Sequence, residues 1–156
     1  MDKTLIIMRG LPSCGKSTRA KELAGDSGLI YSTDEYWYKI RKPDEPDKYS
    51  FNPRYLADAH RWNQKRAQRS IELGEPLIII DNTNVTPAEP RAYVDYAVNQ
   101  DYKVQIEEPT SPWWLEIREL LLERKANKKA LKDWAIELSK KSQLTHGVPE
   151  WAIERM

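Results

Sequence analysis

The sequence predicts a single α/β domain with a mostly parallel sheet of about four strands, helices on both faces of the sheet and a basic helical lid. The apolar run 5–8 leads directly into a glycine-containing turn and a helix-like segment, and the run 77–80 has no polar alternation. Such continuous runs are typical of parallel strands that helices cover on both sides. The length of 156 residues suits one domain spanning 1–156.

The first apolar run continues into a stretch from Gly10 to Ser17 that fits the pattern G-x-x-x-x-G-K-[ST]. The pattern is typical of a loop whose backbone N–H groups surround a polyphosphate, and glycine is needed where φ is positive. Lys16 can reach the β- and γ-phosphates, and the Ser17 hydroxyl can bind Mg²⁺. A helix starting near Gly15 points its N-terminus at the same anion. We therefore predict a site for Mg²⁺ and a nucleoside triphosphate, ATP or GTP, formed by Gly10, Pro12, Ser13, Cys14, Gly15, Lys16, Ser17 and Thr18.

A second strand is expected at 29–32, after a turn marked by Gly25 and Gly28. Asp34 follows this strand, and ligands of open parallel sheets bind beside the carboxyl ends of the strands. Its carboxylate could be the catalytic base that takes the proton from an attacking hydroxyl. It could also cap a helix that starts at Glu35, and position alone leaves both roles open.

A helix is expected to begin at Asn52-Pro53 and to stop at Gly74, because these are typical capping, first-turn and terminating residues. Residues 41–51 contain two prolines and no apolar period, which predicts a surface loop. A rotation of about 100° per residue defines the helix face that should be buried. This face consists of Leu56, Ala59, His60, Asn63, Ala67, Ser70 and Ile71.

Two members of the predicted buried face, His60 and Asn63, are polar. They suit either buried hydrogen bonds or a role in substrate binding. Tyr55, Trp62 and Arg66 flank the same face and could either pack or line a groove for a nucleobase.

The apolar run 77–80 is expected to form a central strand, and Asp81 stands at its carboxyl end. An acidic residue in this place fits the second acidic element of a phosphate-loop enzyme, which holds Mg²⁺ directly or through water. The metal ligands are therefore predicted to be Ser17 and Asp81. The polar residues 82–84 could contact either substrate.

The C-terminal half is expected to contain a helix over 86–98, a less buried strand over 102–106, and further helices from 111, from 127 and over 149–156. Eight basic residues against four acidic ones between 118 and 141 suggest that two of these helices form a lid, over about 112–146, that closes on the phosphates. The candidate phosphate-binding cations of the lid are Arg118, Arg124, Lys140 and Lys141.

The composition narrows the class of protein. Twenty-five basic and 24 acidic residues give a net charge of +1, so total charge does not indicate a polyanionic partner, but residues 54–69 hold five basic residues and one acidic residue. Cys14 is the single cysteine, which excludes an internal disulfide and favours a reducing intracellular compartment, cytoplasm or nucleus. The longest apolar stretch is too short to span a bilayer, so no membrane partner is expected.

Several separated motifs resemble the polynucleotide-kinase-like P-loop proteins. This group includes the phage 5′-polynucleotide kinase domain, the kinase domain of the Nedd-four-binding proteins and modules of RNA repair and ligation enzymes. The resemblance covers nearly the whole chain, and stretch 59–63 is most similar to the Nedd-four-binding subgroup. Its motifs are residues 9–18, 31–34, 81–84, 108–113 and 146–149.

The resemblance implies transfer of the γ-phosphate of a nucleoside triphosphate to the 5′-hydroxyl of DNA or RNA. Lys16 and Ser17 would bind phosphates and Mg²⁺, Asp34 would be the base and Asp81 would support the metal. The family usually has arginines just before the motif 146–149, whereas this chain has Lys140 and Lys141, which lack the planar fork of arginine. Two alternatives stay open: a small-metabolite or nucleotide kinase, and a nucleotide-binding scaffold with little transfer activity.

Overall fold

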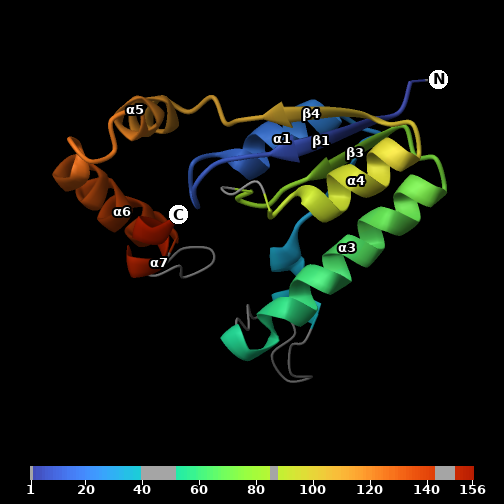
Figure 1. Cartoon of the computed structure of the whole chain (residues 1–156), viewed down its shortest axis with the longest axis horizontal. Helices are drawn as coiled ribbons and strands as arrows, with labels where there is room; N and C mark the ends of the chain where they lie inside the picture. Colours follow the sequence, from blue (N-terminus) through green and yellow to red (C-terminus); the bar gives the residue numbers. More distant parts are fainter. Residues whose placement is uncertain (1, 40–51, 85–87, 143–149) are drawn as a thin grey trace.

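The computed structural model describes residues 2–39, 52–84, 88–142 and 150–156. Its centre is a four-stranded sheet in the order β2-β3-β1-β4, and every pairing is parallel. The prediction of an α/β fold with a mostly parallel sheet of about four strands is confirmed (Figure 1). The strands are β1 (Thr4–Met8), β2 (Leu29–Tyr31), β3 (Leu77–Ile80) and β4 (Lys103–Glu107).

Helix α1 (Lys16–Ala24) covers one face of the sheet. Successive side chains of a strand point to opposite faces, and on this side Ile6 and Met8 of β1 meet Ala20 and Ala24 of α1. The phosphate loop therefore joins a central strand directly to a helix that packs beneath it.

Helices α3 (Leu56–Glu72) and α4 (Arg91–Asn99) cover the other face. The alternate residues of the two central strands point to this side, where they form the largest core cluster. Its buried members are Leu5, Ile7, Ala67, Ile71, Ile78, Ile80, Tyr93, Ala97 and Tyr102. The expected covering of both faces is thus observed.

The short helices η1 (Thr33–Glu35) and α2 (Tyr36–Lys39) follow β2, and η2 (Pro53–Tyr55) precedes α3. As predicted, the Asn52 side chain caps this segment by accepting a hydrogen bond from the Arg54 amide at 3.0 Å. Residues 40–51, including the predicted surface loop, lie outside the described residues.

The predicted buried face of α3 is wrong at its N-terminal end. His60 is exposed and Leu56 is 41 % exposed, whereas Ala59, Asn63 and Ala67 are fully buried. The physical reason is visible in Figure 1, where the N-terminal half of α3 extends past the sheet and lies beside the segment that follows β2. Among the described residues, no strand lies at this end of α3 to cover His60 or Leu56, so the helical period cannot by itself say which turns are buried.

Helix α4 also departs from the expectation, because it begins at Arg91 instead of near residue 86. Residues 85–87 lie outside the described part of the chain, and 88–90 form a turn. The predicted strand over 102–106 is found as β4 at the edge of the sheet, with Gln105 and Ile106 exposed. The prediction that this strand is less buried is therefore confirmed.

The C-terminal helices are α5 (Pro112–Leu121), α6 (Lys128–Ser142) and α7 (Glu150–Arg155). They share a third apolar cluster with the phosphate loop, in which Leu11 and Cys14 meet Trp114 and Leu138. The motif 146–149 lies outside the described residues. Within the described ranges no helix has the length and apolar character needed to cross a membrane.

Candidate functional site

The phosphate loop lies between β1 and α1 and adopts the backbone conformation that its pattern predicts. Gly15 has φ of 91°, and Ser13 has φ of 63°, a left-handed conformation that is uncommon for a residue with a Cβ atom. Lys16 Nζ donates a hydrogen bond to the Leu11 carbonyl oxygen at 3.0 Å, so the ammonium already lies over the loop. Burial lowers the pKa of Lys16, and the negative charges of Asp81 and Asp34 act in the opposite direction.

Residues after β4 hold the phosphate loop in place, and sequence reasoning did not assign them this role. Ser111 Oγ donates to the Cys14 carbonyl at 2.8 Å, and Trp113 Nε1 donates to the Ser13 carbonyl at 3.0 Å. These partners are 97 and 100 residues apart along the chain, so no local pattern could have found them. They fix two carbonyls of the loop from outside.

Ser17 and Asp81 meet at the carboxyl ends of the central strands. Ser17 Oγ donates to Asp81 Oδ2 at 2.7 Å, and Asp81 is only 8 % exposed. Hydroxyl and carboxylate oxygens are the donors that Mg²⁺ prefers, and Mg²⁺ at phosphoryl-transfer sites commonly uses one or two protein ligands together with substrate phosphates. This pair therefore fits the predicted metal site. Among the described residues no group of three or more His, Cys, Asp or Glu side chains is placed to hold a metal by itself.

Asp34 lies within η1, directly after β2. Ser32 caps η1: its Oγ accepts from the Asp34 amide at 3.3 Å, while Glu35 Oε1 accepts from the Ser32 amide at 3.3 Å. The negative charge of the Asp34 carboxylate acts on Lys16 and opposes part of the lowering of its pKa by burial. The structure thus brings Lys16, Ser17, Asp81 and Asp34 together beside the carboxyl ends of the strands.

The polar loop 82–84 forms hydrogen bonds with the segments that follow β1 and β2. Asn82 Oδ1 accepts from the Thr33 amide at 2.9 Å, and the Gly10 amide donates to the Thr83 carbonyl at 3.0 Å. Asn84 is buried and its Nδ2 donates to the Met8 carbonyl at 2.7 Å. These contacts join the ends of β1, β2 and β3, so Asn84 has a structural role.

Cys14 is fully buried in the phosphate loop. Burial raises the pKa of its thiol to about 11, although the positive charges of Lys16 and Lys141 and a backbone hydrogen bond at Leu11 act to lower it. The side chain is therefore a neutral packing group at physiological pH.

The four candidate lid cations occupy different surroundings. Lys141 Nζ lies 4.6 Å from the ring centroid of Trp113, which itself contacts the phosphate loop. Lys140 forms an exposed ion pair with Glu137 at 3.6 Å. By position, Lys141 is the lid lysine associated with the phosphate loop.

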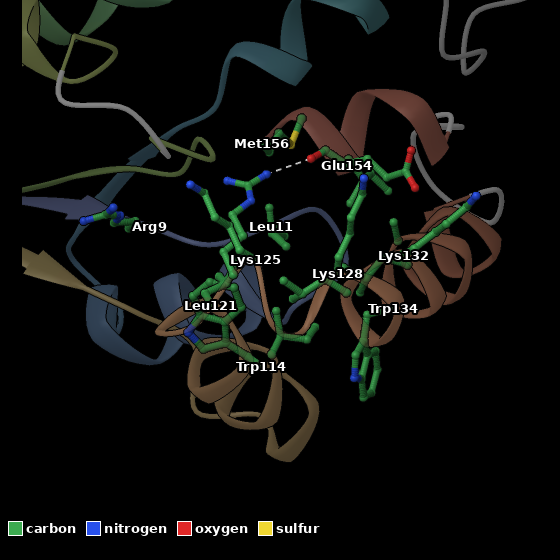
Figure 2. Close-up of a pocket in the computed structure, with 16 residues that line it drawn as sticks. Arg9, Leu11, Trp114, Leu121, Lys125, Lys128, Lys132, Trp134, Glu154 and Met156 are labelled. Atoms are coloured by element: carbon green, nitrogen blue, oxygen red, sulfur yellow. Dashed lines mark hydrogen bonds between the residues drawn. The ribbon is translucent and has the colours of Figure 1, made fainter.

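The two arginines of the predicted lid, Arg118 and Arg124, bind protein groups. Arg124 Nη2 donates to the Glu154 carbonyl of α7 at 2.9 Å, and Arg118 pairs with Glu108 at 3.2 Å. Arg124 lines a cavity of about 780 Å³ between the lid helices and the start of the phosphate loop (Figure 2). Its wall is apolar at Leu11 and Trp114, and its other basic residues are Arg9, Lys125, Lys128 and Lys132.

Comparison with known proteins agrees with this arrangement. A family model described as an AAA domain matches residues 5–143. Human NEDD4-binding protein 2 is 42 % identical over 118 residues, which are 74 % of this chain and 6 % of that protein. The chain therefore spans only a small part of this curated relative.

Solved structures share the fold. In the structure of the Pnkp1/Rnl/Hen1 RNA repair complex, a chain matches with a TM-score of 0.56 at 20 % identity, over 99 % of this chain and 42 % of that one. A candidate kinase from Chloroflexus aurantiacus matches with a TM-score of 0.54 at 17 % identity, over 83 % of this chain and 69 % of that one. The family match extends over most of the chain, and the phosphate loop has the geometry of a nucleotide-binding loop, so the chain belongs to the family described as an AAA domain.

Proposed function

We propose that this domain transfers the γ-phosphate of ATP or GTP to the 5′-hydroxyl of a nucleic acid, with Mg²⁺ bound at Ser17 and Asp81. The observation that carries the proposal is the Ser17–Asp81 hydrogen bond of 2.7 Å beside the half-buried Lys16. It joins the phosphate loop to the acidic strand end that a phosphotransferase needs. In this proposal, Ser17 and Asp81 would hold the Mg²⁺ that accompanies the nucleotide.

The site residues support a direct transfer. Asp34 takes the proton of the acceptor hydroxyl, whose oxygen then bonds to the γ-phosphorus while the bond from that phosphorus to the β,γ-bridging oxygen breaks. The products are a phosphorylated acceptor and a nucleoside diphosphate. Lys16 stabilises charge on the transferred phosphoryl group. When bound, Mg²⁺ neutralises charge on the β- and γ-phosphates.

Two observations favour a nucleic acid as the acceptor. The outer face of α3 carries exposed basic residues at Arg61, Lys65 and Arg69, which suit contacts with a phosphate backbone. The second observation is the fold shared with a chain of an RNA repair complex. A small-metabolite kinase does not need a basic exterior of this kind.

The test is transfer of label from γ-labelled ATP or GTP to a panel of acceptors with purified protein and Mg²⁺. The panel contains 5′-hydroxyl and 5′-phosphate oligonucleotides of DNA and RNA, free nucleosides and small hydroxyl compounds. We expect label on 5′-hydroxyl oligonucleotides only. Label on small molecules alone would show that the domain is a small-metabolite or nucleotide kinase. Nucleotide binding with no labelled acceptor would favour a nucleotide-binding scaffold. A Lys16→Ala preparation controls for a contaminating kinase.

A further inference from the structure

We propose that Arg66 of α3 is a positioning residue that fixes the turn carrying Asp34. The inference rests on the proposed function, because it assumes that Asp34 is the base. Arg66 binds groups of Ser32 and Glu35 in that turn, so it would affect the reaction by holding Asp34 in place. The side chain of Arg66 is only 24 % exposed although it carries a charge.

The guanidinium of Arg66 binds the turn at both ends. Nη2 donates to the Ser32 carbonyl oxygen at 3.2 Å, and Nη1 donates to Glu35 Oε2 at 3.0 Å. Ser32 and Glu35 are the two residues of the capping box around η1, and Asp34 lies between them. One side chain of α3 thus contacts the residues on either side of the proposed base.

Two aromatic rings fix the plane of the guanidinium. The Cζ atom of Arg66 lies 3.8 Å from the centroid of the Trp62 ring and 4.8 Å from that of Tyr31. Tyr36 packs on Trp62 with a centroid separation of 5.5 Å. Arginine suits this place because its planar group can stack and donate several hydrogen bonds at once, whereas lysine offers a single ammonium.

The helix side of this contact is anchored in the core. Arg66 Nη2 also donates to Asn63 Oδ1 at 2.7 Å, and the fully buried Asn63 donates from Nδ2 to the Tyr93 hydroxyl of α4 at 3.0 Å. One turn further along α3, Ser70 forms a hydrogen bond with the hydroxyl of Tyr31, the last residue of β2. The guanidinium is therefore held by a chain of contacts that reaches the sheet.

The turn is held from two directions. On the side of β3, Asn82 binds the Thr33 amide at 2.9 Å, and on the side of α3 the only described bonds to Ser32 and Glu35 from another element come from Arg66. A variant without Arg66 keeps the hydrogen bond between Asn82 and the Thr33 amide and the Ser32 cap. The turn should therefore stay formed but move more freely. A misplacement of about 1 Å in a reacting group can lower a rate by about 100-fold.

The same contacts bear on the two roles that the sequence leaves open for Trp62 and Arg66. Trp62 has Arg66 on its ring at 3.8 Å and Tyr36 packed against it. Trp62 and Arg66 therefore bind each other and the turn, which favours packing over a nucleobase groove.

The kinetic test compares Arg66→Ala and Arg66→Lys with the unchanged chain, using an acceptor that the unchanged chain phosphorylates. We expect kcat to fall by about 10- to 100-fold in Arg66→Ala, with the KM and Kd for the nucleotide changed by less than about 2-fold. Arg66→Lys should recover little, because one ammonium cannot stack and bind both ends of the turn. Added methylguanidinium should restore part of the turnover of Arg66→Ala, and methylamine should not.

The matched control is Arg155→Ala. Arg155 also lies over an indole ring, that of Trp151 at 5.5 Å, but it belongs to α7 and contacts no residue of the 32–35 turn in any described interaction. Its substitution should leave kcat unchanged. Equal losses in Arg66→Ala and Arg155→Ala, or full activity in Arg66→Lys, would overturn the role assigned to Arg66.

A second measurement does not depend on transfer. Amide hydrogen exchange in Arg66→Ala should be faster at residues 32–36 and unchanged in the phosphate loop and β3, as followed by mass spectrometry. Unchanged exchange at 32–36 would overturn the positioning role whatever the activity. If the unchanged chain phosphorylates no acceptor, the proposed function fails, and the exchange result still decides whether Arg66 fixes the turn.

Discussion

Two regions of the molecule hold their polar groups in opposite ways. One is the edge of the sheet formed by the carboxyl ends of its strands, which carries the phosphate loop, and the other is the helical region α5–α7. At the sheet edge, Lys16, Ser17 and Asp81 are bound to one another or to the loop, at distances of 2.7 to 3.0 Å. In the helical region, Lys140 forms an exposed ion pair, and Arg124 binds the backbone of a neighbouring helix. The first region is organised before any ligand arrives.

The difference matters because exposed ion pairs contribute little free energy and their side chains are easily redirected. Preorganised groups in a partly buried site, in contrast, act on a transition state without further rearrangement. We therefore expect substitutions at the sheet edge to have much larger effects on catalysis than substitutions of single lid cations. The predictions below test this contrast from the largest effect to the smallest.

Lys16→Ala should remove nearly all transfer activity, by at least about 1,000-fold in kcat/KM, because the proposed function assigns this ammonium, which lies over the phosphate loop, to stabilise the transferred phosphoryl group. Steady-state transfer assays give the ratio. Lys21→Ala, which removes an exposed lysine from the same helix, is the matched control and should leave the ratio unchanged. Comparable losses in both variants would show that the effect comes from the stability of α1.

Asp34→Asn should lower kcat by about 100-fold or more, because the amide cannot accept the proton of the acceptor hydroxyl. The Kd for the nucleotide, measured by calorimetry, should change by less than about 3-fold, since the site for the triphosphate stays intact. Unchanged turnover in this variant would remove Asp34 as the base.

The two neighbouring lysines of the lid allow a finer test. Lys141→Ala should lower kcat by about 10-fold, because its ammonium lies near Trp113 and the phosphate loop, and removing a single stabilising contact has an effect of this order. Lys140→Ala, which removes the same charge one residue away, should change kcat by less than about 2-fold. Equal effects would mean that net lid charge matters and the position of Lys141 does not.

The smallest effect is expected at Cys14. The pKa of about 11 keeps the buried thiol protonated, so alkylation by iodoacetamide at pH 8 should be at least about 100-fold slower than for a free cysteine. The folded-state pKa lies above the ordinary value, so the contribution to stability is complete below pH about 9 and is lost as the pH rises toward 11. Denaturation midpoints of the unchanged chain and Cys14→Ala, compared across pH 8 to 11, measure this loss. Rapid alkylation of the folded chain at pH 8 would contradict the raised pKa and the burial of the Cys14 thiol.

The sequence predicts the parts of the site that follow from contiguous residues. The phosphate loop, the central strand ending at Asp81 and the place of Asp34 after β2 all depend on short patterns with a direct physical meaning. The roles of Ser111 and Trp113 could not be predicted, because their partners in the phosphate loop lie about 100 residues away. The exposure of His60 was missed for a related reason, since the periodicity of α3 does not show where the sheet beneath it ends.

The hydrogen bond from Lys16 to the Leu11 carbonyl has a consequence for how a nucleotide arrives. At one of the three donors of the ammonium, an arriving triphosphate exchanges places with the Leu11 carbonyl oxygen. Because a phosphate oxygen carries more negative charge than a carbonyl, the exchange should draw a proton onto any Lys16 that is neutral. At alkaline pH, nucleotide binding should therefore be accompanied by proton uptake, visible as a dependence of the binding enthalpy on the ionisation enthalpy of the buffer.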